Sequence, residues 1–183
     1  LTPTITITKT PLPPSLTPTP CAASVPTEGV TDVLTPHAAS TQEMVKNYGG
    51  IGIFDAVLTN SGYDFLVVYF EGMLLKQNYV TPDDLNWQIR LQNCEIISPI
   101  GLGFPVAGVG NPVLMLGILT QGSLMISEGG AAPLIALVYI VHDNSESLSL
   151  ISPSGRENPL LITSEWLPEE ENDVASFAYD DDG

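Results

Sequence analysis

The residues that could carry out chemistry are few in this chain of 183 residues. It has two histidines, His37 and His142, which are far apart in the sequence. No Gly-x-Ser-x-Gly motif marks a hydrolase nucleophile, and no Gly-rich loop with a following Lys is present to hold a phosphate. The sequence therefore predicts no catalytic residue, no cofactor and no enzymatic activity.

Paired carboxylates keep one alternative open. Asp83–Asp84 follow Pro82, and Asp143 lies near Glu146. A glycosidase needs two carboxylates that are close in space, and sequence spacing cannot select such a pair. The Pro82–Leu85 segment is typical of a turn in which Asp side chains bond to nearby backbone amides. A small carboxylate-dependent hydrolase is thus retained as an alternative function.

Charge and metal-ligand counts exclude further classes of function. The net charge is −16, with 21 acidic and 5 basic residues, so phosphate backbones are repelled and no nucleic-acid partner is expected. Two His and two Cys are too few for a structural zinc site without carboxylates, so no metal site is predicted. The segment Asp180–Gly183 offers oxygen ligands but lacks the alternation and the bidentate Glu of an EF-hand loop, and calcium binding by this end of the chain is left open.

The two cysteines, Cys21 and Cys94, are a candidate disulfide. In an oxidising compartment they could pair and fasten the N-terminal segment to the body of the protein. Closing such a long loop is worth about 4 kcal/mol in the chain-entropy treatment. The alternative is two unpaired thiols, with Cys94 buried or half-buried. We favour the disulfide.

Composition divides the chain into three parts. Residues 1–20 hold seven Thr and six Pro with one charge, which is typical of an extended stalk before an exported domain. We expect a Thr/Pro-rich spacer and linker over 1–36, a folded domain over 37–163 and an acidic tail over 164–183, both ends being disordered. The chain starts at Leu1, which we interpret as a processed product or a fragment.

The body of the chain shows the patterns of short strands separated by turn residues. Phe65–Phe70 is apolar at every position, as in a strand covered on both faces, and Trp87–Ile97 alternates with Trp87 inward and Arg90 outward. Only 38–48 has the character of a short helix. The other expected strands are Ile51–Leu58, Val113–Leu119, Ser123–Ser127, Leu134–Val141, Leu148–Ile151 and Leu160–Thr163. This spacing predicts an all-β, antiparallel sandwich.

An uncharged stretch between Glu95 and Glu128 contains three Pro and six Gly, which exclude a transmembrane helix. Within it, Gly101–Asn111 is expected to be a long loop, and long loops on rigid scaffolds often bind partners. The candidate contact residues of this loop are Gly101, Gly103, Phe104, Pro105, Gly108, Gly110 and Asn111.

Two segments carry a resemblance to a known family. The first runs from Asp64-Phe65-Leu66-Val67-Val68-Tyr69 to Val80-Thr81-Pro82-Asp83-Asp84-Leu85-Asn86-Trp87, and the second from Gly130-Ala131-Ala132-Pro133 through Val141 to Ser152-Pro153-Ser154-Gly155. Over about Ile51–Thr163 the chain resembles the telokin-like, immunoglobulin-like extracellular domains of bacterial secreted proteins and lipoproteins, whose function is largely unassigned. The resemblance implies an exported immunoglobulin-like β-sandwich used for contacts with other molecules.

These observations together predict a non-enzymatic module at the bacterial cell surface or outside the cell. It would contact a protein or a surface glycan. The alternatives are a structural spacer domain of a larger envelope protein and the hydrolase named above. The residues fix neither the identity of the ligand nor the oligomeric state.

Overall fold

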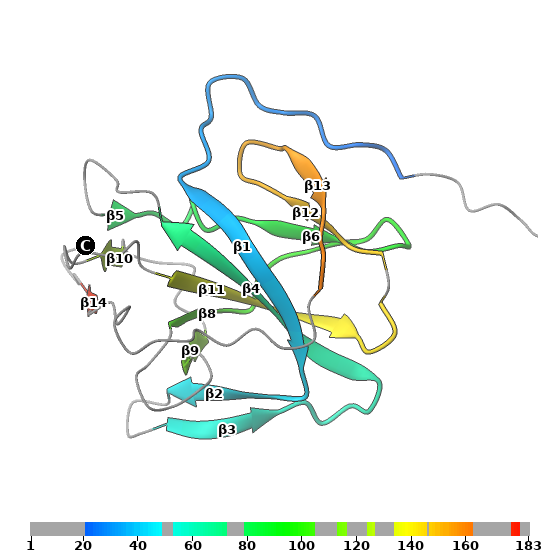
Figure 1. The fold of residues 1–183 in the computed structure, drawn as a ribbon, viewed down its shortest axis with the longest axis vertical. Coiled ribbons are helices and arrows are strands. Elements are labelled where there is room, and N and C mark those ends of the chain that lie inside the picture. Colours follow the sequence, from blue (N-terminus) through cyan, green and yellow to red (C-terminus); the bar gives the residue numbers. More distant parts are fainter. Residues whose placement is uncertain are drawn as a thin grey trace, which may run out of the picture.

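The computed structural model describes residues 21–48, 53–72, 79–104, 113–116, 124–126, 134–145, 147–162 and 177–179. Every secondary-structure element assigned in these stretches is a strand, which confirms the all-β prediction (Figure 1). None of the described stretches contains a helix of the length and apolarity needed to span a membrane. Residues 1–20 of the expected linker and most of the expected acidic tail lie outside the described residues.

The largest sheet, sheet A, has seven strands in the order β1–β4–β11–β8–β9–β2–β3. Neighbouring strands are antiparallel, except that β2 and β9 run parallel. Only Glu43 separates β1 from β2, which lie five places apart in this order, so the sheet must curve strongly. The strands are β1 (Leu34–Gln42), β2 (Met44–Tyr48), β3 (Ile53–Val57), β4 (Tyr63–Gly72), β8 (Gly101–Phe104), β9 (Val113–Leu116) and β11 (Leu134–His142).

Two smaller sheets complete the described fold. Sheet C has the order β13–β12–β6–β7, and sheet B has the order β14–β10–β5, all antiparallel. The strand β14 lies within the expected acidic tail, so this part of the tail is paired in a sheet. The strands are β5 (Tyr79–Val80), β6 (Gln88–Arg90), β7 (Ile96–Ile97), β10 (Leu124–Ile126), β12 (Ser149–Ile151), β13 (Glu157–Pro159) and β14 (Phe177–Tyr179).

Strands β4 and β11 pair over nine residues and are buried on both faces along most of their length. The residues Phe65–Phe70 and Ile135–Tyr139 are each at most 4% exposed. Because successive side chains of a strand point to opposite faces, each of these strands contributes side chains to two separate cores. This confirms the interpretation of Phe65–Phe70 as a strand covered on both faces.

The first core lies between sheet A and sheet C. Phe70 of β4 contacts Trp87, with ring centroids 4.8 Å apart. The buried hydroxyl of Tyr139 donates a hydrogen bond of 3.0 Å to the backbone carbonyl of Trp87, and burial raises the pKa of Tyr139 well above its ordinary value. Ile89 of β6 and Leu150 of β12 fill the same core. Sheet C is therefore fastened to sheet A by apolar packing and by a buried hydrogen bond.

The second core lies on the opposite face of β4 and β11, against Val45 of β2. It is smaller than the first core and contains buried polar groups. Ser40 is 2% exposed and Asn47 is 8% exposed. Burial raises the pKa of Tyr69, an effect that hydrogen bonds with the side chains of Gln42 and Ser40 partly offset. The polar groups of β1 thus meet the hydroxyl of Tyr69 inside the curved sheet.

A disulfide joins Cys21 to Cys94 across a sequence separation of 73, with Cα atoms 5.3 Å apart. Cys94 is exposed and occupies the turn between β6 and β7, where its φ of 69° lies in a region that L residues other than Gly rarely adopt. The disulfide fixes residue 21 to sheet C. It also accounts for a Cys at a backbone conformation that would suit Gly.

Polar contacts hold the rest of residues 21–33 along sheet C. Arg90 donates to Glu157 at 2.8 Å and to the Ser24 hydroxyl at 2.8 Å, and these side chains lie largely out of water. Further along, the Asp32 carboxylate accepts hydrogen bonds from the Ser154 amide and hydroxyl at 2.9 and 2.7 Å. The linker expected over 1–36 is therefore wrong for residues 21–33, which are bound to the body before β1 begins at Leu34.

Gly155 allows this close approach. Its φ is +82°, and a Cβ placed there would lie 2.6 Å from the carbonyl oxygen of Val25. Any larger residue would push the N-terminal stretch away from sheet C and strain the turn. The sequence Ser152–Gly155 is therefore shaped to receive residues 25–32.

Three of the secondary-structure elements expected from the sequence need correction. The short helix expected over 38–48 is replaced by β1 and β2, because pairing with β4 and β3 supplies the backbone hydrogen bonds that local propensity assigned to a helix. The strand expected over Trp87–Ile97 is a hairpin of β6 and β7, reversed at Leu91–Cys94. The final strand expected at Leu160–Thr163 lies earlier in the chain. It is β13, because Glu157–Pro159 are the residues that pair with β12.

We predict that replacing both cysteines with Ala lowers the free energy of unfolding by about 4 kcal/mol, because the 73-residue separation makes the closed loop long. Denaturant unfolding of the oxidised protein and of the double variant measures this. The single variant Cys21→Ala should be destabilised to a similar extent. Equal stability of all three proteins would contradict a structural role for the bond.

The ion pair of sheet C predicts an acid-sensitive contribution to stability. The hydrogen bond from Arg90 is the main reason that the pKa of Glu157 lies below its ordinary value. A carboxylate with a lowered pKa in the folded state stabilises the fold above the pKa of the unfolded chain, and this contribution is lost as pH falls through the folded-state pKa.

Glu157→Gln should therefore reduce the free energy of unfolding at pH 7 by about 1.5–3 kcal/mol, the usual value for a hydrogen bond to a charged group. The difference from wild type should shrink below the ordinary pKa of a Glu carboxyl. Urea titrations at a series of pH values test this, with Glu95→Gln at an exposed position as the control. A difference that does not vary with pH would contradict the assignment.

Candidate functional site

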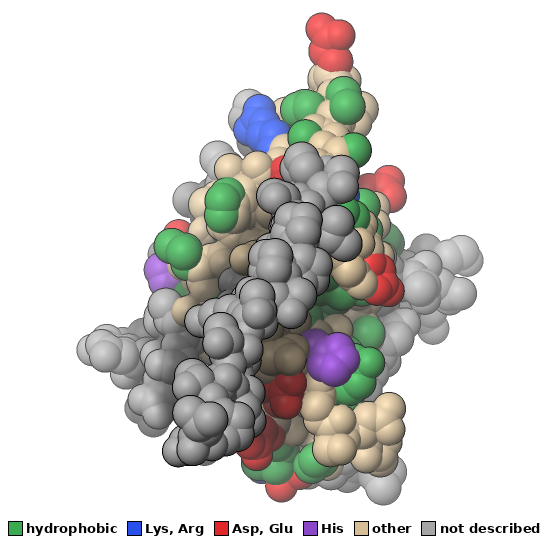
Figure 2. All heavy atoms as spheres, turned by 90° about the vertical axis from the view of Figure 1, so that its right-hand side faces the viewer, with side chains coloured by type: hydrophobic (Ala, Val, Ile, Leu, Met, Phe, Trp, Pro, Cys, Tyr) green, Lys and Arg blue, Asp and Glu red, His purple; other side chains and the backbone are tan. Residues whose placement is uncertain are grey.

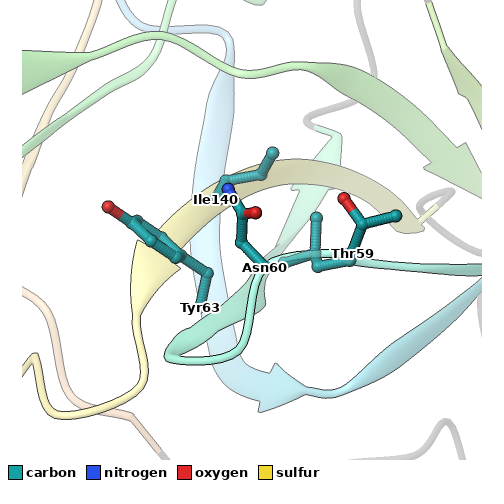
Figure 3. Close-up of a pocket in the computed structure, with 5 residues that line it drawn as sticks. Thr59, Asn60, Tyr63 and Ile140 are labelled. Carbon is teal, nitrogen blue, oxygen red and sulfur yellow. The ribbon is translucent and has the colours of Figure 1, made fainter.

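A surface hollow of about 280 Å³ lies beside the turn that joins β3 to β4. In Figure 3 the Asn60 side chain extends from this turn toward Ile140 of the neighbouring strand β11, and the ring of Tyr63, the first residue of β4, points away from Ile140. The lining residues are Leu58, Thr59, Asn60, Tyr63 and Ile140. The volume lies just below the usual range of ligand pockets, about 300–1,000 Å³, which suits one sugar ring or one side chain better than a large ligand.

The hollow forms where the second core runs out. Tyr63 and Ile140 point to the same faces of β4 and β11 as the buried residues Phe65 and Val138, because Tyr63 lies two residues before Phe65 and Ile140 lies two residues after Val138. Tyr63 is 40% exposed and Ile140 is 36% exposed, whereas Phe65 is 4% exposed. At this end of β4 and β11, side chains on the face of the second core are therefore exposed to solvent.

The turn beside the hollow has a specific backbone geometry. Gly62 has a φ of +95°, and its carbonyl accepts a hydrogen bond of 3.1 Å from the amide of Asp143. This bond ties the β3–β4 turn to the turn after β11. The expected turn at Asn60–Gly62 is confirmed, and the pairing of β4 with β11 brings it next to the expected turn at His142–Asn144.

Two rings stand at the edge of the hollow. The ring centroids of Tyr63 and His142 lie 4.3 Å apart, and their planes are inclined by 35°. The Asp143 carboxylate lies 3.9 Å from Nδ1 of His142, at a distance too long for a hydrogen bond. His142 thus supports one face of the Tyr63 ring, and the polar groups of Asn60 and Thr59 border the apolar floor. The arrangement offers stacking, apolar contact and hydrogen bonding.

The residues considered for catalysis are dispersed in the structure. His37 pairs with Glu71 across β1 and β4 at 2.9 Å, on a different strand pair from the β3–β4 turn. The Asp84 carboxylate accepts hydrogen bonds from the Thr81 amide and hydroxyl, which confirms the interpretation of this segment as local turn chemistry. Glu146 lies outside the described residues. Within the described ranges, no cluster of three or more His, Cys, Asp or Glu could hold a metal ion.

The expected contact loop is only partly a loop. Gly101, Gly103 and Phe104 belong to β8, which pairs with β11 on one side and β9 on the other. Gly101 and Gly103 are buried, so they present no contact surface, and Leu102 between them enters the first core. Pairing on both sides satisfies the backbone of this Gly-rich segment, which local propensity alone did not predict. Pro105, Gly108, Gly110 and Asn111 lie outside the described residues.

No protein-family model matches the chain, and no curated protein or solved structure is significantly similar to it. The assignment of a function therefore depends on the residues of this chain alone.

Tyr63, His142 and Asn60 are not among the site residues predicted from the sequence. Local signals were present, because Asn60 and His142 both stand in segments recognised as turns. What was missing is the register of β4 with β11, which sets Tyr63 opposite His142 although 79 positions separate them in the numbering.

We predict that Gly62→Ala lowers the free energy of unfolding by about 1 kcal/mol, because Ala at a φ of +95° is strained. A steric clash does not contribute to this loss, since the nearest atom to an added Cβ is Cε1 of His142 at 3.9 Å. Denaturant unfolding measures the cost, with Gly29→Ala, at a φ of +84° in an open N-terminal turn, as the control for strain away from the hollow. Unchanged stability in Gly62→Ala would show that the turn relaxes freely.

Proposed function

We propose that this chain is a non-enzymatic, exported module of immunoglobulin-like β-sandwich type that binds a surface glycan through the hollow beside Tyr63. The observation that carries the proposal is the exposed Tyr63 ring, supported by His142 and bordered by an apolar floor and polar groups. These groups offer stacking, apolar contact and hydrogen bonding, which are the interactions of a binding site.

A sugar ring suits the chemistry of this hollow. The C–H face of a pyranose is apolar and packs on an aromatic ring, while its hydroxyl groups need hydrogen-bonding partners. Tyr63 offers the ring, Ile140 and Leu58 offer apolar floor, and Asn60 and Thr59 offer donors and acceptors at the border. The volume of about 280 Å³ favours recognition of one ring of a longer chain, and the open shape leaves the neighbouring sugars in solvent.

Location outside the cytoplasm is supported by the disulfide between Cys21 and Cys94, since such bonds persist in oxidising compartments. The covalent attachment lies at the first residue after the Thr/Pro-rich stretch 1–20. A stalk ending at a disulfide would present the body of the protein as a rigid unit, which suits a binding module at the cell surface. We propose a bacterial origin because the chain resembles domains of bacterial secreted proteins and lipoproteins.

The proposal predicts that Tyr63→Ala abolishes most glycan binding. Wild-type protein applied to a panel of bacterial envelope polysaccharides should bind at least one of them, and calorimetry then gives the affinity. Loss of the ring should weaken binding by about tenfold or more, the effect typical of an aromatic residue at the centre of a contact. Tyr63→Phe should retain most of the affinity, because the ring is kept.

The matched control is Ile96→Ala, which removes a similarly exposed side chain on sheet C. It should bind as wild type does. Absence of binding to every polysaccharide in the panel, or equal affinities of wild type and Tyr63→Ala, would overturn the proposal and favour a spacer role for the domain.

A further inference from the structure

The free sheet edges of the described fold differ in how they are protected. An exposed edge strand offers unpaired backbone groups to another strand, and proteins usually block it with Pro, a bulge, charge or short length. In sheet A, β1 has a register irregularity between Pro36 and Ala38, and the exposed His37 pairs with Glu71. In sheet C, β13 contains Pro159 and β7 has only two residues. The edge strands of sheet B are short, since β14 has three residues and β5 has two.

The edge strand β3 lacks the Pro, the register irregularity and the short length that protect the other edges. It is five residues long, contains no Pro and pairs with β2 in continuous register. It is the last strand of sheet A, drawn at the lower end of the molecule in Figure 1. Its one charge, Asp55, is paired with Lys46 on β2. In the described part of the chain, alternate backbone N–H and C=O groups of β3 therefore point away from β2 without a strand to receive them.

The outer face of β3 is apolar on either side of this ion pair. Ile53 is 46% exposed and Val57 is 63% exposed, and Met44, opposite Val57 on β2, is 38% exposed. The inner face of the same hairpin is covered, since Val45 is 1% exposed. An added strand would extend both the backbone hydrogen bonding and this alternating face.

Charge decides which kind of strand fits. The chain carries a net charge of −16, so a second copy is repelled. Symmetric antiparallel pairing of two β3 strands about their central residue would also set Asp55 opposite Asp55. Figure 2 shows acidic side chains spread from end to end of the face it draws. A basic residue beside Asp55 would instead continue the charge alternation begun by Lys46.

We propose that the β3 edge binds an extended segment of a partner protein by strand addition, with Lys or Arg beside Asp55 and apolar side chains two residues before and after it. The recognition pattern is thus apolar-x-basic-x-apolar. This inference does not depend on the glycan proposal, because it uses the edge of β3 at Ile53 and Asp55 and not the hollow that begins at Leu58.

The probe is the acetylated, amidated peptide Thr-Ile-Thr-Lys-Thr-Ile-Thr, compared with peptides that carry Asp or Pro in place of the central Lys. Amide hydrogen exchange of the full chain is followed by NMR as peptide is added. We expect slower exchange at alternate residues of β3 with the Lys peptide, a weaker effect with the Asp peptide and none with the Pro peptide. Asp55→Asn should reduce the preference for Lys over Asp by about twofold to fivefold, the range of one cross-strand pair.

Val57→Lys and Ile53→Lys place a charge on the exposed edge and should remove the protection, whereas Ile96→Lys on β7 should leave it intact. Tyr63→Ala should also leave it intact, which separates this test from that of the hollow. No protection of β3 by millimolar Lys peptide would overturn the proposal. So would equal protection by all three peptides, or a dimer of the chain that Ile53→Lys dissociates.

Discussion

The structure depends on the burial of one antiparallel strand pair on both of its faces. Side chains of β4 and β11 alternate between a core against sheet C and a core against β2, and almost none of their apolar surface reaches water between Phe65 and Phe70. An apolar strand of this kind is stable only when cover is supplied on each side. Sheet C supplies this cover on one face, and β2 contributes to it on the other.

Cover on the first side depends on the N-terminal stretch as well as on sheet C. The disulfide at Cys94, the hydrogen bonds of Ser24 with Arg90 and Glu157 and the bonds of Asp32 to Ser154 all join residues 21–33 to that sheet. Because β1 follows directly and pairs with β4, these contacts also fix where β1 begins. A segment with the composition of a linker therefore becomes part of the fold through a disulfide and hydrogen bonds.

The candidate binding surfaces occur where the covering arrangement stops. The hollow beside Tyr63 is the open end of the second core, and the β3 edge is the limit of the sheet that encloses this core. Both surfaces expose apolar groups next to polar ones, which is the usual composition of a recognition site.

The sequence by itself determined the class of the fold, the turns at Asn60–Gly62 and His142–Asn144 and the double burial of Phe65–Phe70, because each follows from local composition and period. It also made the pairing of Cys21 with Cys94 a reasonable expectation. Tertiary structure decided that 38–48 forms strands, that Gly101–Phe104 lies inside a sheet and that Tyr63 meets His142. These features depend on hydrogen bonds and contacts with segments distant in sequence, and residue propensity and hydrophobic period carry no record of which distant strand will be the neighbour.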